Sequence, residues 1–122
     1  MFKLRKGARI YLAGPMRGVP DLNVPIFKAA AADLRERGFS VYNPATYDSR
    51  EAVAKGMTPE KATACYSFAW FMAKDLPHVC TADAVVVLAG WRKSQGARLE
   101  ALVARECGIP VLSYPTLGEV AR

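Results

Sequence analysis

The stretch that decides the fold is "ADAVVVLAGWRKSQGARLEALVARECG", residues 82–108. Its first part is an uninterrupted apolar run, which is typical of a strand buried on both faces of a sheet. A loop with glycine follows, and Ser94 is then expected to cap the start of a helix. A buried strand that leads through a loop into a helix favours an α/β protein with a parallel sheet.

The rest of the chain repeats this alternation of strand and helix. Three further strands are predicted from apolar runs: about residues 8–13 within "ARIYLAG", "FSVYNP", and about residues 109–114 within "IPVLSYP". Proline and glycine positions predict two further helices. One runs from Pro25 to about Arg37, where Gly38 stops it, and the other is opened by Thr58 and Pro59 and is bent or ended by Pro77. We therefore expect one doubly wound α/β domain over residues 1–122, Rossmann- or flavodoxin-like, with a mostly parallel sheet of four to five strands.

Composition and charge describe an ordinary globular chain. Hydrophobic residues make up 52% of the 122 residues and charged residues 23%. The net charge of +6 is spread along the chain, apart from one group at residues 3–9. This distribution argues against nucleic-acid binding and suits a small anionic substrate such as a nucleotide. There is no apolar run long enough for a membrane span or a signal peptide, so we expect a cytoplasmic protein.

The cysteines suggest neither a disulfide framework nor a metal site. Cys65, Cys80 and Cys107 are odd in number and lack CxxC spacing. Cys107 falls on the predicted buried face of the last helix, where an inert thiol is expected.

Glu100 does not fit the amphipathic pattern expected of that helix. At 100° per residue it lies near the middle of an arc of small apolar residues that includes Ala97, Ala101 and Ala104. The two interpretations are a carboxylate that enters a pocket and a glutamate that pairs with Arg98 or Lys93.

Two loops leave the carboxyl ends of the predicted strands, where ligands bind in such sheets. They are "AGPMRG" after the first strand and "AGWRKSQG" after the third. Both combine glycine with arginine, and the second leads into a helix N-terminus, which favours an anion such as phosphate.

Three motifs together carry a resemblance to a known family. "IYLAGPMRG", "KDLPHVCTADAVVVLAGW" and "SQGARLE", in this order and at nearly these spacings, resemble the nucleoside 2-deoxyribosyltransferase superfamily over about residues 8–115. Within it the chain is similar to the nucleoside 5'-monophosphate N-glycosidases and to an uncharacterised branch common in phage genomes. The resemblance implies an enzyme that cleaves the N-glycosidic bond by a retaining, covalent route.

The resemblance also implies roles for individual residues. Glu100 matches the nucleophile, Asp75 the residue that positions the substrate and transfers a proton to the base, and Tyr11 the hydroxyl that orients the glutamate. Substrate-binding positions are then expected at Gly14, Arg17, Gly18, Trp91, Ser94 and Gly96. Trp91 is open to two interpretations, since it can cover the base or pack against its loop. Asn23 is expected to cap the first helix, and Asp83 to be structural.

The predicted function is hydrolysis of a (deoxy)nucleoside 5'-monophosphate to base and sugar phosphate. The alternatives are base exchange by a deoxyribosyltransferase and a non-catalytic nucleotide-binding module. No metal or organic cofactor is expected, because the nucleophile is a carboxylate. The aromatic group Tyr66, Phe68, Trp70 and Phe71 favours a subunit interface, and family members assemble as dimers or larger, so a homo-oligomer is expected.

Overall fold

A five-stranded sheet in the order β2-β1-β3-β4-β5 forms the centre of the fold. The computed structural model describes residues 3–46, 56–58, 61 and 67–121. Four strands run parallel and β5 pairs antiparallel with β4: β1 (Arg9–Ala13), β2 (Ser40–Tyr42), β3 (Ala84–Val87), β4 (Val111–Ser113) and β5 (Gly118–Glu119). The predicted mostly parallel sheet is confirmed.

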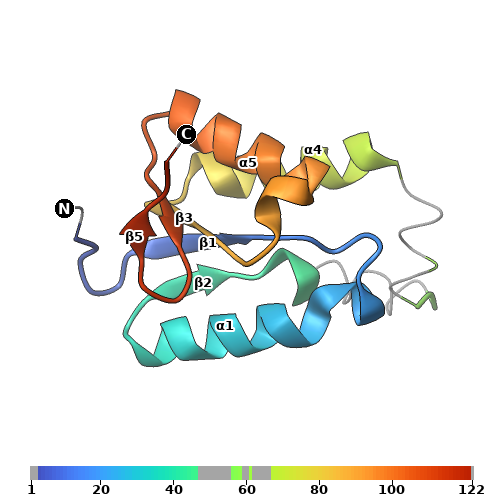
Figure 1. Ribbon diagram of the computed structural model, residues 1–122, viewed down its shortest axis with the longest axis horizontal. Coiled ribbons are helices and arrows are strands. Elements are labelled where there is room, and N and C mark those ends of the chain that lie inside the picture. The colour runs from blue at the N-terminus through green and yellow to red at the C-terminus, as the bar shows by residue number, and fades with distance from the viewer. Residues whose placement is uncertain (1–2, 47–55, 59–60, 62–66, 122) are drawn as a thin grey trace.

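Helices cover both faces of this sheet. Helix α1 (Val24–Glu36) lies on one side, and α4 (Phe68–Cys80) and α5 (Gln95–Glu106) lie together on the other (Figure 1). Two short 3-10 turns, η1 (Pro20–Asn23) and η2 (Trp91–Lys93), lead into α1 and α5. The predicted doubly wound α/β fold is therefore confirmed.

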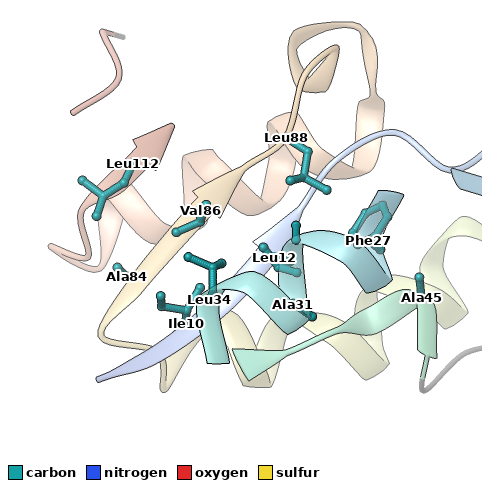
Figure 2. Packing of buried hydrophobic residues seen from close by; sticks show 11 residues of the cluster. Ile10, Leu12, Phe27, Ala31, Leu34, Ala45, Ala84, Val86, Leu88 and Leu112 are labelled. Carbon is teal, nitrogen blue, oxygen red and sulfur yellow. The ribbon is translucent and has the colours of Figure 1, made fainter. Parts of the chain in front are cut away.

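Strand β3 supplies side chains to two hydrophobic clusters, one on each face of the sheet. Ala84 and Val86 pack in the cluster that includes Phe27 and Leu34 of α1 (Figure 2). Val85 and Val87 point the other way, into the cluster beneath α4 and α5. Successive side chains of a strand alternate between faces, so a continuous apolar run is what a strand covered on both sides requires.

Local signals set the ends of two helices. Gly38 follows α1 with φ +98°, and the N–H of Phe39 donates to the Leu34 carbonyl at 3.1 Å, which closes the last turn. Ser94 caps α5, because its Oγ accepts a hydrogen bond from the Ala97 N–H at 3.2 Å. Both predicted signals are confirmed.

The predicted continuous helix from Thr58 is wrong, because α4 begins afresh at Phe68. Ser67 has extended backbone angles, and its Oγ accepts from the Trp70 N–H at 3.0 Å, so the serine caps a new helix. Thr58 does accept from the Lys61 N–H at 3.1 Å, while residues 59–60 and 62–66 lie outside the described residues. Pro77 does not end α4, which runs on to Cys80.

The strand order reverses at β1, which is the topological switch point of the sheet. This strand pairs with β2 on one side and with β3 on the other. The loops after β1 and β3 therefore diverge to opposite faces, and a crevice opens between them at the carboxyl ends of the strands. The fold places any ligand site there.

Two sequence predictions concern the surface. Cys107 is exposed where a buried thiol was predicted, because it caps the C-terminal end of α5 and points past the packed face. Within the described part of the chain, no helix has the length and apolar character needed to cross a bilayer.

Candidate active site

A cavity of about 270 Å³ lies at the crevice between the loops that follow β1 and β3. Its walls come from the 14–17 loop, the start of α1, the N-terminal half of α4 and the first turns of α5. Six of the residues expected from the sequence line it: Gly14, Arg17, Asp75, Ser94, Gly96 and Glu100. The volume is near the lower end of the range of small-molecule sites, roughly 300–1,000 Å³.

Glu100 reaches this cavity from the packed side of α5. The neighbouring Ala97, Ala101 and Ala104 are fully buried, so small side chains bring the helix close to the sheet. Glu100 is itself only 5% exposed, as the helical periodicity predicts. A buried carboxylate needs a hydrogen-bond donor, because desolvation of an unpaired charge is costly.

Tyr11 of β1 is such a donor. Its hydroxyl donates a hydrogen bond to Oε2 of Glu100, across 89 positions of sequence. Burial raises the pKa of Tyr11 well above its ordinary value, and the nearby charges of Glu100 and Asp75 raise it further. The phenol therefore stays protonated throughout the physiological range and keeps its proton available for the carboxylate.

Asp75 is the second carboxyl group of the cavity. It lies on α4, is 1% exposed and lines the same cavity as Glu100. A negative charge on Asp75 raises the pKa of Tyr11, as the charge on Glu100 does. Two acidic side chains from different helices thus converge on one small space, as acid–base chemistry requires.

Two further aromatic rings stack in a column against Tyr11. The Tyr42 ring stacks on Tyr11 with centroids 5.6 Å apart, and His78 stacks on Tyr42 at 3.9 Å. His78 therefore packs against Tyr42 and is not among the cavity residues. Because His78 and Asp75 belong to the same helix, the column also links α4 to the strand that holds Tyr11.

The rim of the cavity carries groups suited to an anion. Lys93 and Ser94 lie at the start of α5, where N–H groups and the helix dipole favour negative charge. The Arg17 guanidinium lies across the cavity, with its Cζ 5.6 Å from the Phe71 ring centre and 6.0 Å from that of Phe68. These two cation–π contacts hold the arginine beside the cavity.

The 14–17 loop approaches β3 closely and is tied to α1. A Cβ on Gly14 would lie 3.0 Å from the Leu88 Cβ, a contact so tight that Leu88 would have to shift to admit a larger residue. The Asn23 side-chain amide donates to the Pro15 carbonyl at 2.9 Å. The sequence predicted that Asn23 caps α1, but its side chain makes no cap hydrogen bond, because its backbone is left-handed (φ +61°) rather than extended. Its amide ties the loop to α1 instead. Asp83 is structural as expected, since its Oδ2 accepts from the Arg9 N–H at 2.8 Å.

Two expected binding residues are not among the cavity residues. Gly18 serves the turn after Arg17, where its φ of +79° favours glycine. Trp91 packs beside the guanidinium groups of Arg92 and Arg105, and this contact favours the packing interpretation of the residue.

The sequence interpretation missed the apolar walls. Most of the cavity residues not anticipated are hydrophobic, together with two polar residues at the rim: Met16, Leu22, Val24, Phe68, Phe71, Met72, Lys93 and Gln95. Phe68 and Phe71 were expected at a subunit interface, but both face the cavity. The available signal was the helical spacing, because Phe68 and Phe71 lie seven and four positions before Asp75 and therefore share its face of α4.

No metal ligand set accompanies these groups in the part of the chain that the structure describes, where no cluster of three or more histidine, cysteine or acidic side chains occurs. The cavity offers two carboxyl groups and cations at its rim, while the protonated phenol of Tyr11, which is fully buried and not among the lining residues, holds Glu100.

Comparisons with known proteins relate the fold to a deoxyribosyltransferase. A family model described as "Domain of unknown function (DUF4406)" matches residues 8–113. A search of curated proteins finds no match. Among solved structures, the chain is similar to the 2-deoxyribosyltransferase of Bacillus psychrosaccharolyticus, a bacterium described as psychrotolerant. The TM-score is 0.63 at 23% identity, over 94% of this chain and 77% of that one.

Proposed function

The chain belongs to the family of the domain of unknown function DUF4406, and we propose that it cleaves the N-glycosidic bond of a nucleoside or nucleotide through a covalent glycosyl-enzyme on Glu100. The observation that carries the proposal is the pair of buried carboxyl groups, Glu100 and Asp75, in one cavity with Tyr11 bound to Glu100. The fold shared with a 2-deoxyribosyltransferase supports it.

Glu100 is the proposed nucleophile. A carboxylate oxygen forms a bond to the anomeric carbon of the sugar while the bond from that carbon to the base nitrogen breaks. Tyr11 holds the other carboxylate oxygen through its hydrogen bond, so the attacking oxygen is fixed in direction. The transition state carries positive charge on the sugar, which the adjacent carboxylate stabilises.

Asp75 is the proposed proton donor to the departing base. Protonation of the base nitrogen makes it a better leaving group, and the aspartate then accepts a proton from whatever attacks the glycosyl ester. That second attack breaks the ester bond and restores the Glu100 carboxylate. The cycle needs no external cofactor and no oxidant.

The acceptor in the second step decides between two activities. Base exchange is favoured by the structural neighbour, which is described as a 2-deoxyribosyltransferase, and by apolar walls that suit a planar base. Hydrolysis of a 5'-monophosphate is the second candidate, and its support is the cationic rim formed by Arg17, Lys93 and the start of α5. The substrate in either case is a small molecule, and we expect a cytoplasmic homo-oligomer.

The test is a product assay with nucleosides and 5'-monophosphates, ribo and deoxy, with and without a second free base. Free base and sugar phosphate from a monophosphate would establish hydrolysis, whereas a new nucleoside formed only with the second base would establish exchange. Glu100→Gln keeps the shape of the side chain and removes the nucleophile. We expect it to lower turnover at least about a thousandfold.

Glu106→Gln is the matched control, because Glu106 is an exposed glutamate at the end of the same helix. It should leave turnover unchanged. Wild-type turnover that survives Glu100→Gln would overturn the assignment of the nucleophile. A panel with no turnover, together with nucleotide binding that Glu100→Gln leaves unaltered, would instead favour a non-catalytic binding module.

A further inference from the structure

Trp91 and two arginines form a clamp on the outer side of the turn that precedes α5. The Arg92 Cζ lies 4.5 Å from a ring centre of Trp91, and the Arg105 Cζ lies at 6.0 Å. Arg92 Nη2 donates to the Ala121 carbonyl at 2.9 Å, and Arg105 Nη2 donates to the same carbonyl at 3.1 Å. The indole is therefore held by two cations that the C-terminal segment fixes in turn.

The sheet anchors the far end of this clamp. Strand β5 pairs with β4, with Glu119 opposite Leu112, and the Val120 N–H donates to the Val111 carbonyl at 3.0 Å. The Val120 carbonyl also accepts from Arg105 at 3.3 Å. In Figure 1 the C-terminal end of the chain runs from β5 towards α5, which is the path these contacts require.

The near end of the clamp is continuous with the rim of the cavity. Trp91 is the first residue of η2, and its carbonyl accepts from the Ser94 N–H at 3.0 Å. The Trp91 N–H donates to the Leu88 carbonyl at 3.2 Å, at the end of β3. Lys93 and Ser94, which line the cavity, lie two and three positions beyond the tryptophan.

We propose that the Trp91 clamp holds the Lys93–Gly96 rim in the position needed to bind the polar end of a nucleotide substrate. Trp91, Arg92 and Arg105 are positioning residues, since their contacts are with the turn and the C-terminal segment. The inference rests on the proposed function for the identity of the ligand. The claim that the clamp orders the rim does not depend on the proposed function.

The kinetic test compares Trp91→Ala with Trp91→Phe. Loss of the indole should raise KM for a 5'-monophosphate roughly tenfold, with kcat changed less than about twofold, because Tyr11, Asp75 and Glu100 are untouched. The phenyl ring keeps a face for the two guanidinium groups and should restore most of the loss. Arg105→Met should resemble Trp91→Ala, whereas Arg98→Met, at an exposed arginine on the same helix, should not.

A second readout needs no activity. Hydrogen exchange at the amides of Lys93 and Ser94 should quicken about tenfold or more in Trp91→Ala, and amides in β1 should be unchanged. Equal exchange at the rim in the two proteins would overturn the clamp, as would a fall in kcat with KM preserved. If the wild-type chain turns over neither nucleosides nor nucleotides, with or without a second base, the proposed function fails, and the exchange rates alone decide whether the clamp orders the rim.

Discussion

Replacement of Tyr11 by phenylalanine tests the contact on which the site depends. The change removes one hydroxyl from a fully buried ring and leaves the stacking with Tyr42 in place. The lost bond is to a carboxyl group that is only 5% exposed. Hydrogen bonds to charged groups are worth about 1.5–3 kcal/mol, and water has little access to replace this one.

The expected effects follow from that magnitude. Stability at pH 8 should fall by about 1.5–3 kcal/mol, or roughly 6–12 °C in Tm for a domain of this size. If the same bond orients the nucleophile in the transition state, kcat/KM should fall by about 10- to 150-fold. Urea denaturation and steady-state assays on the same preparations measure both quantities.

The pH dependence of stability tests the same contact, because the direction of the change can be predicted. Burial raises the pKa of Tyr11 above its value in the unfolded chain, so above pH 10 the unfolded state has released a proton that the folded state retains. Wild-type stability should therefore fall as the pH rises beyond 10, by up to about 1.4 kcal/mol per pH unit, and the Tyr11→Phe variant lacks this contribution. The difference in free energy of unfolding between the wild type and Tyr11→Phe should therefore narrow between about pH 10 and pH 11.

Tyr114→Phe is the matched control. The Tyr114 hydroxyl donates to Asp33 Oδ2 at 2.9 Å, but in a partly exposed place, so its loss should cost about 1 kcal/mol or less and no activity. The reasoning would be refuted if Tyr11→Phe left both Tm and kcat/KM at wild-type values. It would equally be refuted if the two tyrosine variants lost the same amount of stability.

Three further substitutions probe the frame of the site. Gly14→Ala should destabilise the fold by about 1–3 kcal/mol, because the added Cβ meets the Leu88 Cβ at 3.0 Å; thermal melts would show it, and an unchanged Tm would contradict the close approach. Phe27→Ala should cost about 3–5 kcal/mol in urea titrations, since the ring is fully buried under α1, with a smaller loss indicating that the core closes over the gap. Pro77→Ala should raise Tm by a few degrees, because α4 continues past an exposed proline that has no N–H to donate; a lower Tm would mean that the ring itself packs favourably.

Much of the fold could be predicted because its signals are local or periodic. The Val85–Val87 run fits a strand covered on both faces, and Ser94 and Gly38 mark helix ends with specific hydrogen bonds. The burial of Glu100 could also be predicted, since the helical periodicity places it among alanines. In each case the sequence pattern that makes the prediction lies within a few residues or a few helical turns.

The rest depends on contacts between distant segments. Nothing in the sequence around Trp91 indicates that the carbonyls of Val120 and Ala121 hold its arginine neighbours. The start of α4 could not be predicted with certainty, because a capping serine inside an apolar stretch competes with a continuous helix. Asn23 has the residue type of a cap, but its left-handed backbone does not suit capping, and its amide donates to the Pro15 carbonyl of the preceding loop.

The division of the core by the sheet has a consequence for how this protein can change over evolution. Tyr11, Asp75 and Glu100 all belong to the side covered by α4 and α5, whereas residues such as Ile10, Leu12 and Leu34 pack on the side of α1. Mutations of such residues can adjust thermal tolerance with little effect on the three polar groups, because the sheet lies between the two clusters. A lineage that drifts to a new temperature can therefore repack one half of its interior while it keeps the chemistry of the other.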